Sequence, residues 1–274
     1  MIIPRILFLG GNGHCAARLD PARAVMTGEA PFELWDTAYP GFEGRPRSTS
    51  LPEFLDSVRD RLEEATEATH GSILIYATGI GALLALCLRA RGEIVGRRLL
   101  FQAPVLWGLE RRLMPRLMRL RPVQAAAHRV FATRPFRKWF ERRHLPANMD
   151  PALVSAFHEG YARCAALPDL FRWMNPSLLR RLEVDLVARR GALDEIAVWW
   201  GDRDRVVTPT ELRLTEGALG RRWPLRVFRG WGHYPMLEDP RGWVEALAAV
   251  AQPPPTGGRN TSSSPSSRAA SNGA

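Results

Sequence analysis

The sequence predicts an α/β fold: a mostly parallel sheet of about six strands flanked by helices, with a helical cap inserted after the fourth strand. Short apolar runs alternate with segments of helical periodicity, which is typical of a parallel sheet covered on both faces. The alternation stops for one long segment broken by prolines and then resumes. The 274 residues suffice for one large domain with a sizeable core.

Six short apolar runs, most of them closed by glycine or other turn residues, are the predicted strands: 5–10, 32–37, 72–77, 98–102, 195–201 and 224–229. Apolar residues at helical spacing lie between several of them. They predict helices at 51–64, at 80–90, from about Pro209, and at 240–251.

Residues 105–181 form the inserted segment, which is called the cap below. It has no convincing strand and contains seven prolines, so we expect several short helices. The predicted core then comprises 1–104 and 182–251. The last stretch, 252–274, is rich in Pro, Gly and Ser without apolar periodicity. It cannot bury enough surface to offset its ordering entropy, so we expect a disordered tail.

Positive charge is concentrated in the cap. The whole chain has a net charge of +10, and the cap holds fifteen Arg or Lys against five Asp or Glu, which is the entire excess. A solvated basic face is the simplest interpretation, and such a face favours anionic partners. No nucleic-acid motif is present. The mixture of Trp, Leu, Met and Arg at 106–121 would suit weak contact with a membrane surface, but we favour a lid over an apolar pocket.

Other composition features exclude several classes. The three cysteines are scattered without metal-ligand spacing, so we expect no metal. We also expect no cofactor. No apolar run reaches about 18 residues, which argues against a transmembrane segment. The N-terminus lacks the basic region and cleavage site of a signal peptide, and we expect a cytoplasmic protein.

Three turns follow strands at the carboxyl edge of the sheet, where open α/β sheets build their sites. The first, within 74–86, reads LIYATGIGALLAL, the second, at 200–209, reads WGDRDRVVTP, and the third, at 230–240, reads GWGHYPMLEDP. Together with LFLGGNG at 7–13 and DTAYPGFEG at 36–44, they resemble the α/β-hydrolase superfamily in kind and order. The resemblance spans residues 5–251.

The resemblance identifies His233 as the general base and Asp204 as the acid that orients it, while Asp202 caps or orients the acid loop. The small residues Ala77 and Gly81 of the elbow put the degenerate nucleophile position at Gly79. Glycine has no side chain and cannot attack a carbonyl carbon. It does adopt the strained backbone of an elbow without steric cost.

Two other nucleophiles are weaker candidates. Thr78 would need Tyr76 and Ile80 as the small neighbours of the elbow, and both are too large. Cys15 follows the first glycine loop, but a lone cysteine is more often a packing residue.

The resemblance also places the oxyanion hole at the backbone N–H groups of Asn12 and Ile80. The histidine that usually precedes the glycine of this loop is here Gly10. We further expect four residues to line a substrate pocket: Gly11, His14, Trp107 and Tyr234.

Three functions follow from these residues. The first, which we favour, is hydrolysis of an ester or thioester-type bond in a hydrophobic or anionic small molecule by water that His233 activates. The second is a lyase, isomerase or cofactor-free oxygenase in which His233 takes a proton from the substrate. The third is a non-catalytic protein that binds a ligand or partner. The predicted Asp–His pair favours an enzyme, because a binding protein has no need for an oriented histidine.

Overall fold

A six-stranded sheet lies at the centre of the molecule, with strand order β2-β1-β3-β4-β5-β6 and every neighbouring pair parallel. The computed structural model describes residues 3–26, 30–67, 73–146, 149–189 and 191–252. The strands are β1 (Arg5–Leu9), β2 (Glu33–Asp36), β3 (Ile73–Thr78), β4 (Arg98–Gln102), β5 (Ile196–Gly201) and β6 (Leu225–Phe228). All six predicted strands and the predicted fold class are confirmed.

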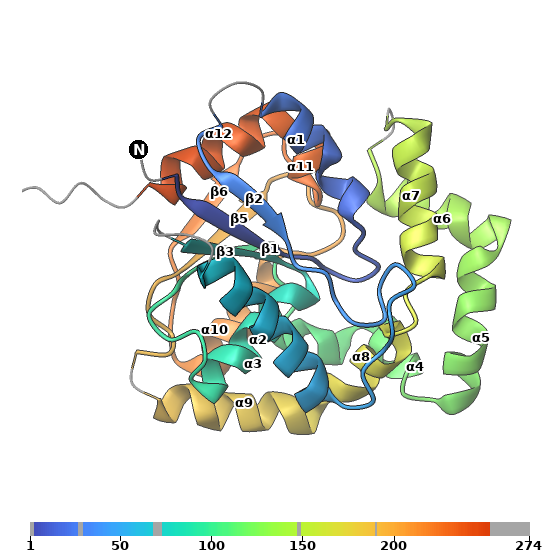
Figure 1. Cartoon of the computed structure of the whole chain (residues 1–274). Coiled ribbons are helices and arrows are strands. Elements are labelled where there is room, and N and C mark those ends of the chain that lie inside the picture. Colours follow the sequence, from blue (N-terminus) through green and yellow to red (C-terminus); the bar gives the residue numbers. More distant parts are fainter. Residues whose placement is uncertain (1–2, 27–29, 68–72, 147–148, 190, 253–274) are drawn as a thin grey trace, which may run out of the picture.

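Helices cover both faces of the sheet (Figure 1). On one face lie α2 (Leu51–Glu67), α3 (Ile80–Arg91), α9 (Pro176–Ala188) and α10 (Pro209–Leu219). On the other lie α1 (Asp20–Val25), α11 (Pro235–Glu238) and α12 (Pro240–Ala251), with the short 3-10 helix η1 (Ala16–Leu19) leading into α1. The sequence predicted α12 with these same bounds but missed η1, α1 and α11, which are short.

Alternate residues of β1 supply the two cores. Leu7 and Leu9 belong to the larger apolar cluster with α2, α3, α9 and α10, whereas Ile6 and Phe8 belong to the cluster with α1 and α12. Successive side chains of a strand point to opposite faces, so a strand buried on both sides is apolar throughout. The same pairing aligns the carboxyl ends of β1 and β3, where Leu9 is the partner of Ala77.

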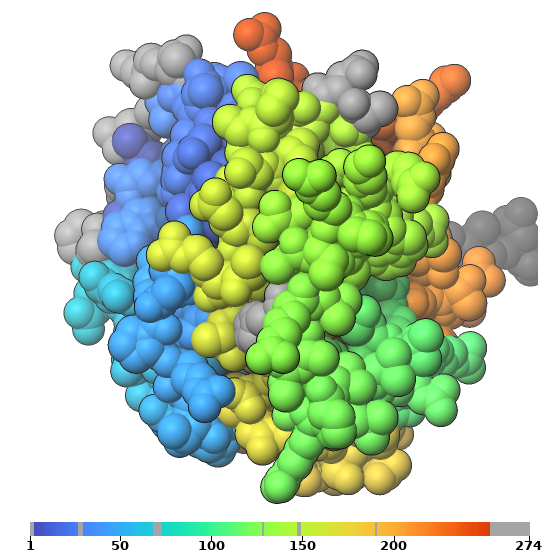
Figure 2. All heavy atoms as spheres, turned by 90° about the vertical axis from the view of Figure 1, so that its right-hand side faces the viewer, coloured from blue at the N-terminus to red at the C-terminus, as the bar shows by residue number. Residues whose placement is uncertain are grey.

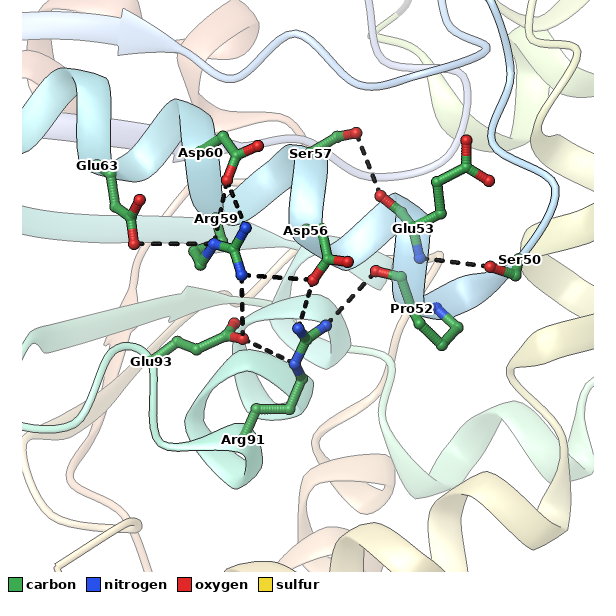
Figure 3. Close-up of polar contacts among 10 residues, drawn as sticks. All are labelled: Ser50, Pro52, Glu53, Asp56, Ser57, Arg59, Asp60, Glu63, Arg91 and Glu93. Atoms are coloured by element: carbon green, nitrogen blue, oxygen red, sulfur yellow. Dashed lines mark hydrogen bonds and ion pairs between the residues drawn. The ribbon is translucent and has the colours of Figure 1, made fainter.

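An ion-pair network on the outside of the molecule joins α2 to the end of α3 (Figure 3). Arg91 contacts Asp56, and its Nε lies 2.8 Å from Oε1 of Glu93. Arg59 lies between Asp56, Asp60 and Glu93. Exposed pairs of this kind contribute little individually, and none of these residues lines the cavity described below.

In the described part of 105–181 the chain forms helices and loops without a strand. The elements are η2 (Trp107–Arg111), α4 (Leu113–Leu117), α5 (Arg121–Ala132), α6 (Arg134–His144), α7 (Pro151–Ala162) and α8 (Leu167–Trp173), followed by α9. Helices α5 to α9 each have a proline in the first two positions. Proline is favoured there because it needs no hydrogen-bond acceptor and its φ suits a helix. Five of the seven prolines of the cap therefore start helices.

Helices α4 to α8 gather beside the carboxyl ends of the strands (Figure 1), and Figure 2 shows α4 to α7 spread over that face of the molecule. Helix α9 differs, because it packs against α3 and α10 and runs on to Ala188. The predicted tail, 252–274, lies outside the described residues except for Gln252, which follows α12.

Candidate active site

Asp204 and His233 form a hydrogen-bonded pair on neighbouring loops. Asp204 follows β5 and His233 follows β6, and Nδ1 of the imidazole lies 2.8 Å from Oδ2 of the carboxylate. The Asp204 side chain is fully buried. Its other oxygen, Oδ1, accepts hydrogen bonds from the backbone N–H groups of Val206 at 2.7 Å and Val207 at 3.0 Å. This arrangement orients the imidazole and leaves its Nε2 available to accept a proton.

The charge of Asp204 is maintained by its partners. Burial alone would raise the pKa of the carboxyl, but the nearby His233 and the N–H groups of Val206 and Val207 outweigh burial and lower the pKa below its usual value. The carboxylate therefore stays ionised at neutral pH and can stabilise a protonated imidazole at His233.

The turn between β3 and α3 has the backbone geometry of an elbow. Gly79 has φ 52° and ψ −119°, a conformation that side chains rarely adopt. A Cβ at residue 79 would lie 3.5 Å from Cα of Gly11, which is ordinary contact. At Gly81 it would lie 2.3 Å from the carbonyl oxygen of Leu9, so position 81 has no room for a side chain.

The first glycine loop and the start of α3 lie beside this turn. Gly11 and Asn12 line the same cavity as Gly79 and Ile80. Ile80 is the first residue of α3, and the first N–H groups of a helix have no partner within the helix. Oδ1 of Asn12 is buried without a hydrogen-bond partner among the described residues. The two residues predicted to supply the oxyanion donors thus line the same cavity as Gly79.

The cavity has a volume of about 550 Å³ and joins these loops to the cap. His233, Tyr234 and Thr78 line it from the core. Cap aromatic residues line it from the other side: Phe131, Phe136, Trp139, Phe140, Tyr161 and Phe171. The structure therefore brings together His233, Gly79 and the glycine loop under an aromatic roof.

Two residues expected in the pocket, His14 and Trp107, do not line this cavity. The backbone N–H of His14 donates to the Gly11 carbonyl in a tight turn. The His14 ring is buried, and its Nε2 lies 2.6 Å from Oδ1 of Asp36. Trp107 opens η2, and its backbone N–H donates to Oγ1 of Thr215 in α10 at 3.4 Å. Both predictions are corrected: His14 contacts β2, and Trp107 packs toward α10.

Cys15 also lies outside the cavity lining. It is buried, and its thiol donates to the carbonyl of Ala156 at 3.5 Å. Burial raises the pKa of this thiol although Arg18 opposes the shift. A protonated, hydrogen-bonded thiol does not act as a nucleophile, which leaves Cys15 a packing residue.

His144, at the end of α6, was missed as a cavity residue and lines the roof. Its ring stacks on Phe140 with 4.5 Å between centroids. Burial lowers the pKa of His144 to about 4, and the positive charges of His233, Arg143 and Arg112 act in the same direction. The cavity therefore contains a second imidazole, neutral at pH 7. No local motif marks it, because its position depends on how the cap packs.

The described residues contain no group of three or more His, Cys, Asp or Glu side chains arranged to hold a metal ion. Within the same residues, none of the helices has the length and apolar character needed to span a bilayer.

The chain matches the model of the alpha/beta hydrolase family over residues 6–247. No curated protein matches the chain. Similar solved structures include Cfl2 from Burkholderia cenocepacia, with a TM-score of 0.65, 16% identity and coverage of 91% of this chain and 88% of that one. Haloalkane dehalogenase DbeA from Bradyrhizobium elkani has a TM-score of 0.63, 18% identity and coverage of 91% and 90%. An epoxide hydrolase from Bacillus megaterium has a TM-score of 0.53, 15% identity and coverage of 89% and 92%.

Proposed function

Because the chain belongs to the alpha/beta hydrolase family, we propose that it hydrolyses an ester or thioester-type bond of a hydrophobic small molecule with water activated by His233. Gly79 stands at the nucleophile position in this proposal. One observation carries it: His233, held by Asp204 at 2.8 Å, lines a cavity that residue 79 leaves free of a side chain. Water has room where a serine hydroxyl would otherwise stand.

The reaction needs one proton acceptor and one anion site. Nε2 of His233 takes a proton from water while the oxygen attacks the acyl carbon, and Asp204 stabilises the imidazolium that forms. The N–H groups of Asn12 and Ile80 bind the oxyanion of the tetrahedral intermediate. When the intermediate collapses, the leaving alcohol or thiol takes the proton from His233, and the acid is released. No covalent acyl-enzyme forms.

The proposed rate is modest. In serine hydrolases, the oxyanion hole and substrate binding retain about 10³–10⁴-fold acceleration when triad members are removed. A positioned general base contributes about 10²–10⁴-fold to reactions of this kind. We therefore expect slow turnover of activated esters and thioesters.

A second candidate function is proton transfer on the substrate itself, as in a lyase, isomerase or cofactor-free oxygenase. The observation in its favour is His144, because a neutral imidazole in the roof faces the same cavity as His233. In such a reaction His233 would remove a proton from a substrate carbon and return it at another atom, while the neutral His144 would donate a hydrogen bond to the substrate. Hydrolysis remains our first proposal because the family to which the chain belongs is that of the alpha/beta hydrolases.

The direct test measures hydrolysis of p-nitrophenyl esters and acyl thioesters by the wild type and by His233→Ala. We expect the variant to lose about a hundredfold or more of kcat/KM, because the base is gone. His158→Ala is a matched control, since His158 is a buried histidine paired with Glu141 outside the cavity lining. Equal activity in His233→Ala and the wild type would overturn the proposal.

A second experiment tests the alignment of the site without relying on a natural substrate. Gly79→Ser should fold, because its Cβ meets only ordinary contact, although the positive φ costs about 1–3 kcal/mol. We expect a fluorophosphonate to label the introduced serine, detected by intact-protein mass spectrometry, and the double variant with His233→Ala to stay unlabelled. A folded but unlabelled Gly79→Ser protein would contradict the proposed alignment.

A further inference from the structure

A buried arginine, Arg18, lines the cavity close to the proposed catalytic histidine. It belongs to η1, directly after the first glycine loop, and only 4% of its surface is exposed. Two of its five N–H donors have backbone acceptors: Nη2 donates to the carbonyl of Gly13 at 2.7 Å and Nη1 to that of Asn12 at 3.4 Å. These bonds fix the position of the guanidinium beside the loop.

Three aromatic rings surround the guanidinium of Arg18, and the side chains of Tyr161 and Cys15 also interact with it through hydrogen bonds. Its guanidinium carbon lies 3.9 Å from the centroid of the Phe157 ring, 5.8 Å from that of Tyr161 and 5.7 Å from that of Tyr234. Aromatic faces attract a cation, but they do not accept its N–H bonds in the plane as a carboxylate does. Nε of Arg18 is accordingly buried without a hydrogen-bond partner in the described part of the chain.

Arg18 also forms no ion pair with a carboxylate among the described residues. The other partly buried arginine of the cavity differs. Arg112 forms a bidentate ion pair with Glu211, in which Nη2 donates to Oε2 at 2.7 Å and Nε donates to Oε1 at 3.0 Å. An unpaired buried charge is costly, so the guanidinium of Arg18 would gain from an incoming anion far more than that of Arg112.

The position of Arg18 relates the anion to the reacting group. Tyr234 is a neighbour of both sites, because its ring centroid is 4.7 Å from that of His233 and 5.7 Å from the guanidinium carbon of Arg18. A ligand in the cavity can therefore contact Arg18 with one end while a group a few bonds away lies at His233.

We propose that Arg18 is the receptor for an anionic group on the ligand, so that the cavity selects acyl compounds that carry a carboxylate or phosphate. Nε, which has no partner among the described residues, and the Nη beside it have the spacing to donate to the two oxygens of one carboxylate. The aromatic roof receives the apolar remainder. That the bound anion is a substrate rests on the proposed hydrolysis, whereas the binding itself does not.

Calorimetric titration with probes that cannot be hydrolysed at an ester tests the proposal: octanoate, octanamide and octyl phosphate near neutral pH. In the wild type we expect octanoate or octyl phosphate to bind about tenfold or more tightly than octanamide. Whichever anion binds more tightly identifies the preferred group. Arg18→Met should reduce the affinity for both anions to that for octanamide and leave octanamide unchanged.

Arg89→Met is the matched control, because Arg89 is also fully buried and donates to a backbone carbonyl, that of Arg97, away from the cavity. It should keep the preference for the anion. Equal affinity of the wild type for octanamide and both anions overturns the proposal even if Arg18→Met fails to fold. So does a folded Arg18→Met protein that keeps the preference. Because binding is measured at equilibrium, an absence of hydrolysis leaves this result intact, and an absent anion preference leaves the hydrolysis proposal standing.

Discussion

Gly79 combines a structural advantage with a chemical loss. Its φ of 52° would strain any other residue by about 1–3 kcal/mol, and glycine removes this strain from the turn between β3 and α3. The turn itself does not depend on the side chain at 79. It depends on Gly81, where a Cβ would collide with the backbone of Leu9, and on the burial of α3. An elbow-like geometry can therefore persist without a nucleophile.

His144 gives the protein a pH-dependent stability that can be measured. Its pKa is about 4 in the folded protein and about 6.5 when unperturbed, so between these values the unfolded chain binds a proton that the folded chain does not. The contribution of His144 to the free energy of unfolding is fully present above about pH 6.5 and is lost as the pH decreases toward 4. The lowered pKa of His144 corresponds to at most about 3 kcal/mol of the free energy of unfolding. His144→Phe should keep the stack on Phe140 and lose this part of the pH dependence.

Urea unfolding of both proteins at several values between about pH 7 and pH 4 checks this prediction. Carboxyl groups titrate in both proteins and cancel in the difference. We expect the free energy of unfolding of His144→Phe to rise relative to that of the wild type as the pH falls. Parallel curves over the whole range would contradict a neutral, partly buried His144.

Helices and strands could be predicted where neighbouring residues determine them, and not where contacts distant in sequence do. The strands and α12 were predictable because their apolar residues repeat at a local period and glycine or proline marks their ends. Helix α1 was missed because it has six residues, and of these only Ala22 is buried. The cap prolines predicted breaks between helices, but the direction in which each helix packs depends on contacts that are distant in sequence, such as Arg112 with Glu211.

Two glycines on helices should respond in opposite ways to alanine. In Gly81→Ala the new methyl group would lie 2.3 Å from the Leu9 carbonyl oxygen and 2.8 Å from that of Gly10, so α3 must move away from β1. We expect a loss of about 3 kcal/mol or more in the free energy of unfolding. Gly217, inside α10, has nothing within 4 Å of the position that an alanine methyl group would take. Gly217→Ala should gain about 0.5–1 kcal/mol, because alanine favours the helix.

Chemical denaturation of the two variants and the wild type gives both values under one condition. A Gly81→Ala protein as stable as the wild type would show that the elbow and the first glycine loop are not in close contact. The Gly217→Ala protein controls for the general effect of alanine on helices.

For the whole molecule, motif order predicted which loops meet, whereas two polar side chains of the cavity lining, Arg18 and His144, were not predicted. Asp204 and His233 were recognisable because each stands in a loop whose neighbours are themselves characteristic. Arg18 and His144 lie in segments without such a pattern, and the approach of the cap to the glycine loop brings both to the cavity. His14 was misplaced because its partner, Asp36, is distant in sequence and draws the ring away from the cavity.

The charge distribution leads to a prediction about association kinetics. The cap carries the whole positive excess of the chain, and its exposed arginines include Arg116 and Arg143, the latter on the cavity wall. Long-range attraction accelerates the approach of an anion and is screened by salt. Raising the ionic strength from about 20 to 300 mM should slow octanoate association about tenfold while its dissociation rate and the association of octanamide change little.

Stopped-flow fluorescence can follow both rates, because Trp139 lines the cavity. The double variant Arg116→Gln, Arg143→Gln should lose part of the salt dependence. The control Arg213→Gln, Arg222→Gln removes the same charge from exposed positions outside the cavity lining and should behave like the wild type. If octanoate and octanamide associate with equal sensitivity to salt, the basic cap does not steer ligands to the site. The preference for anions would then depend on close contact with Arg18 alone.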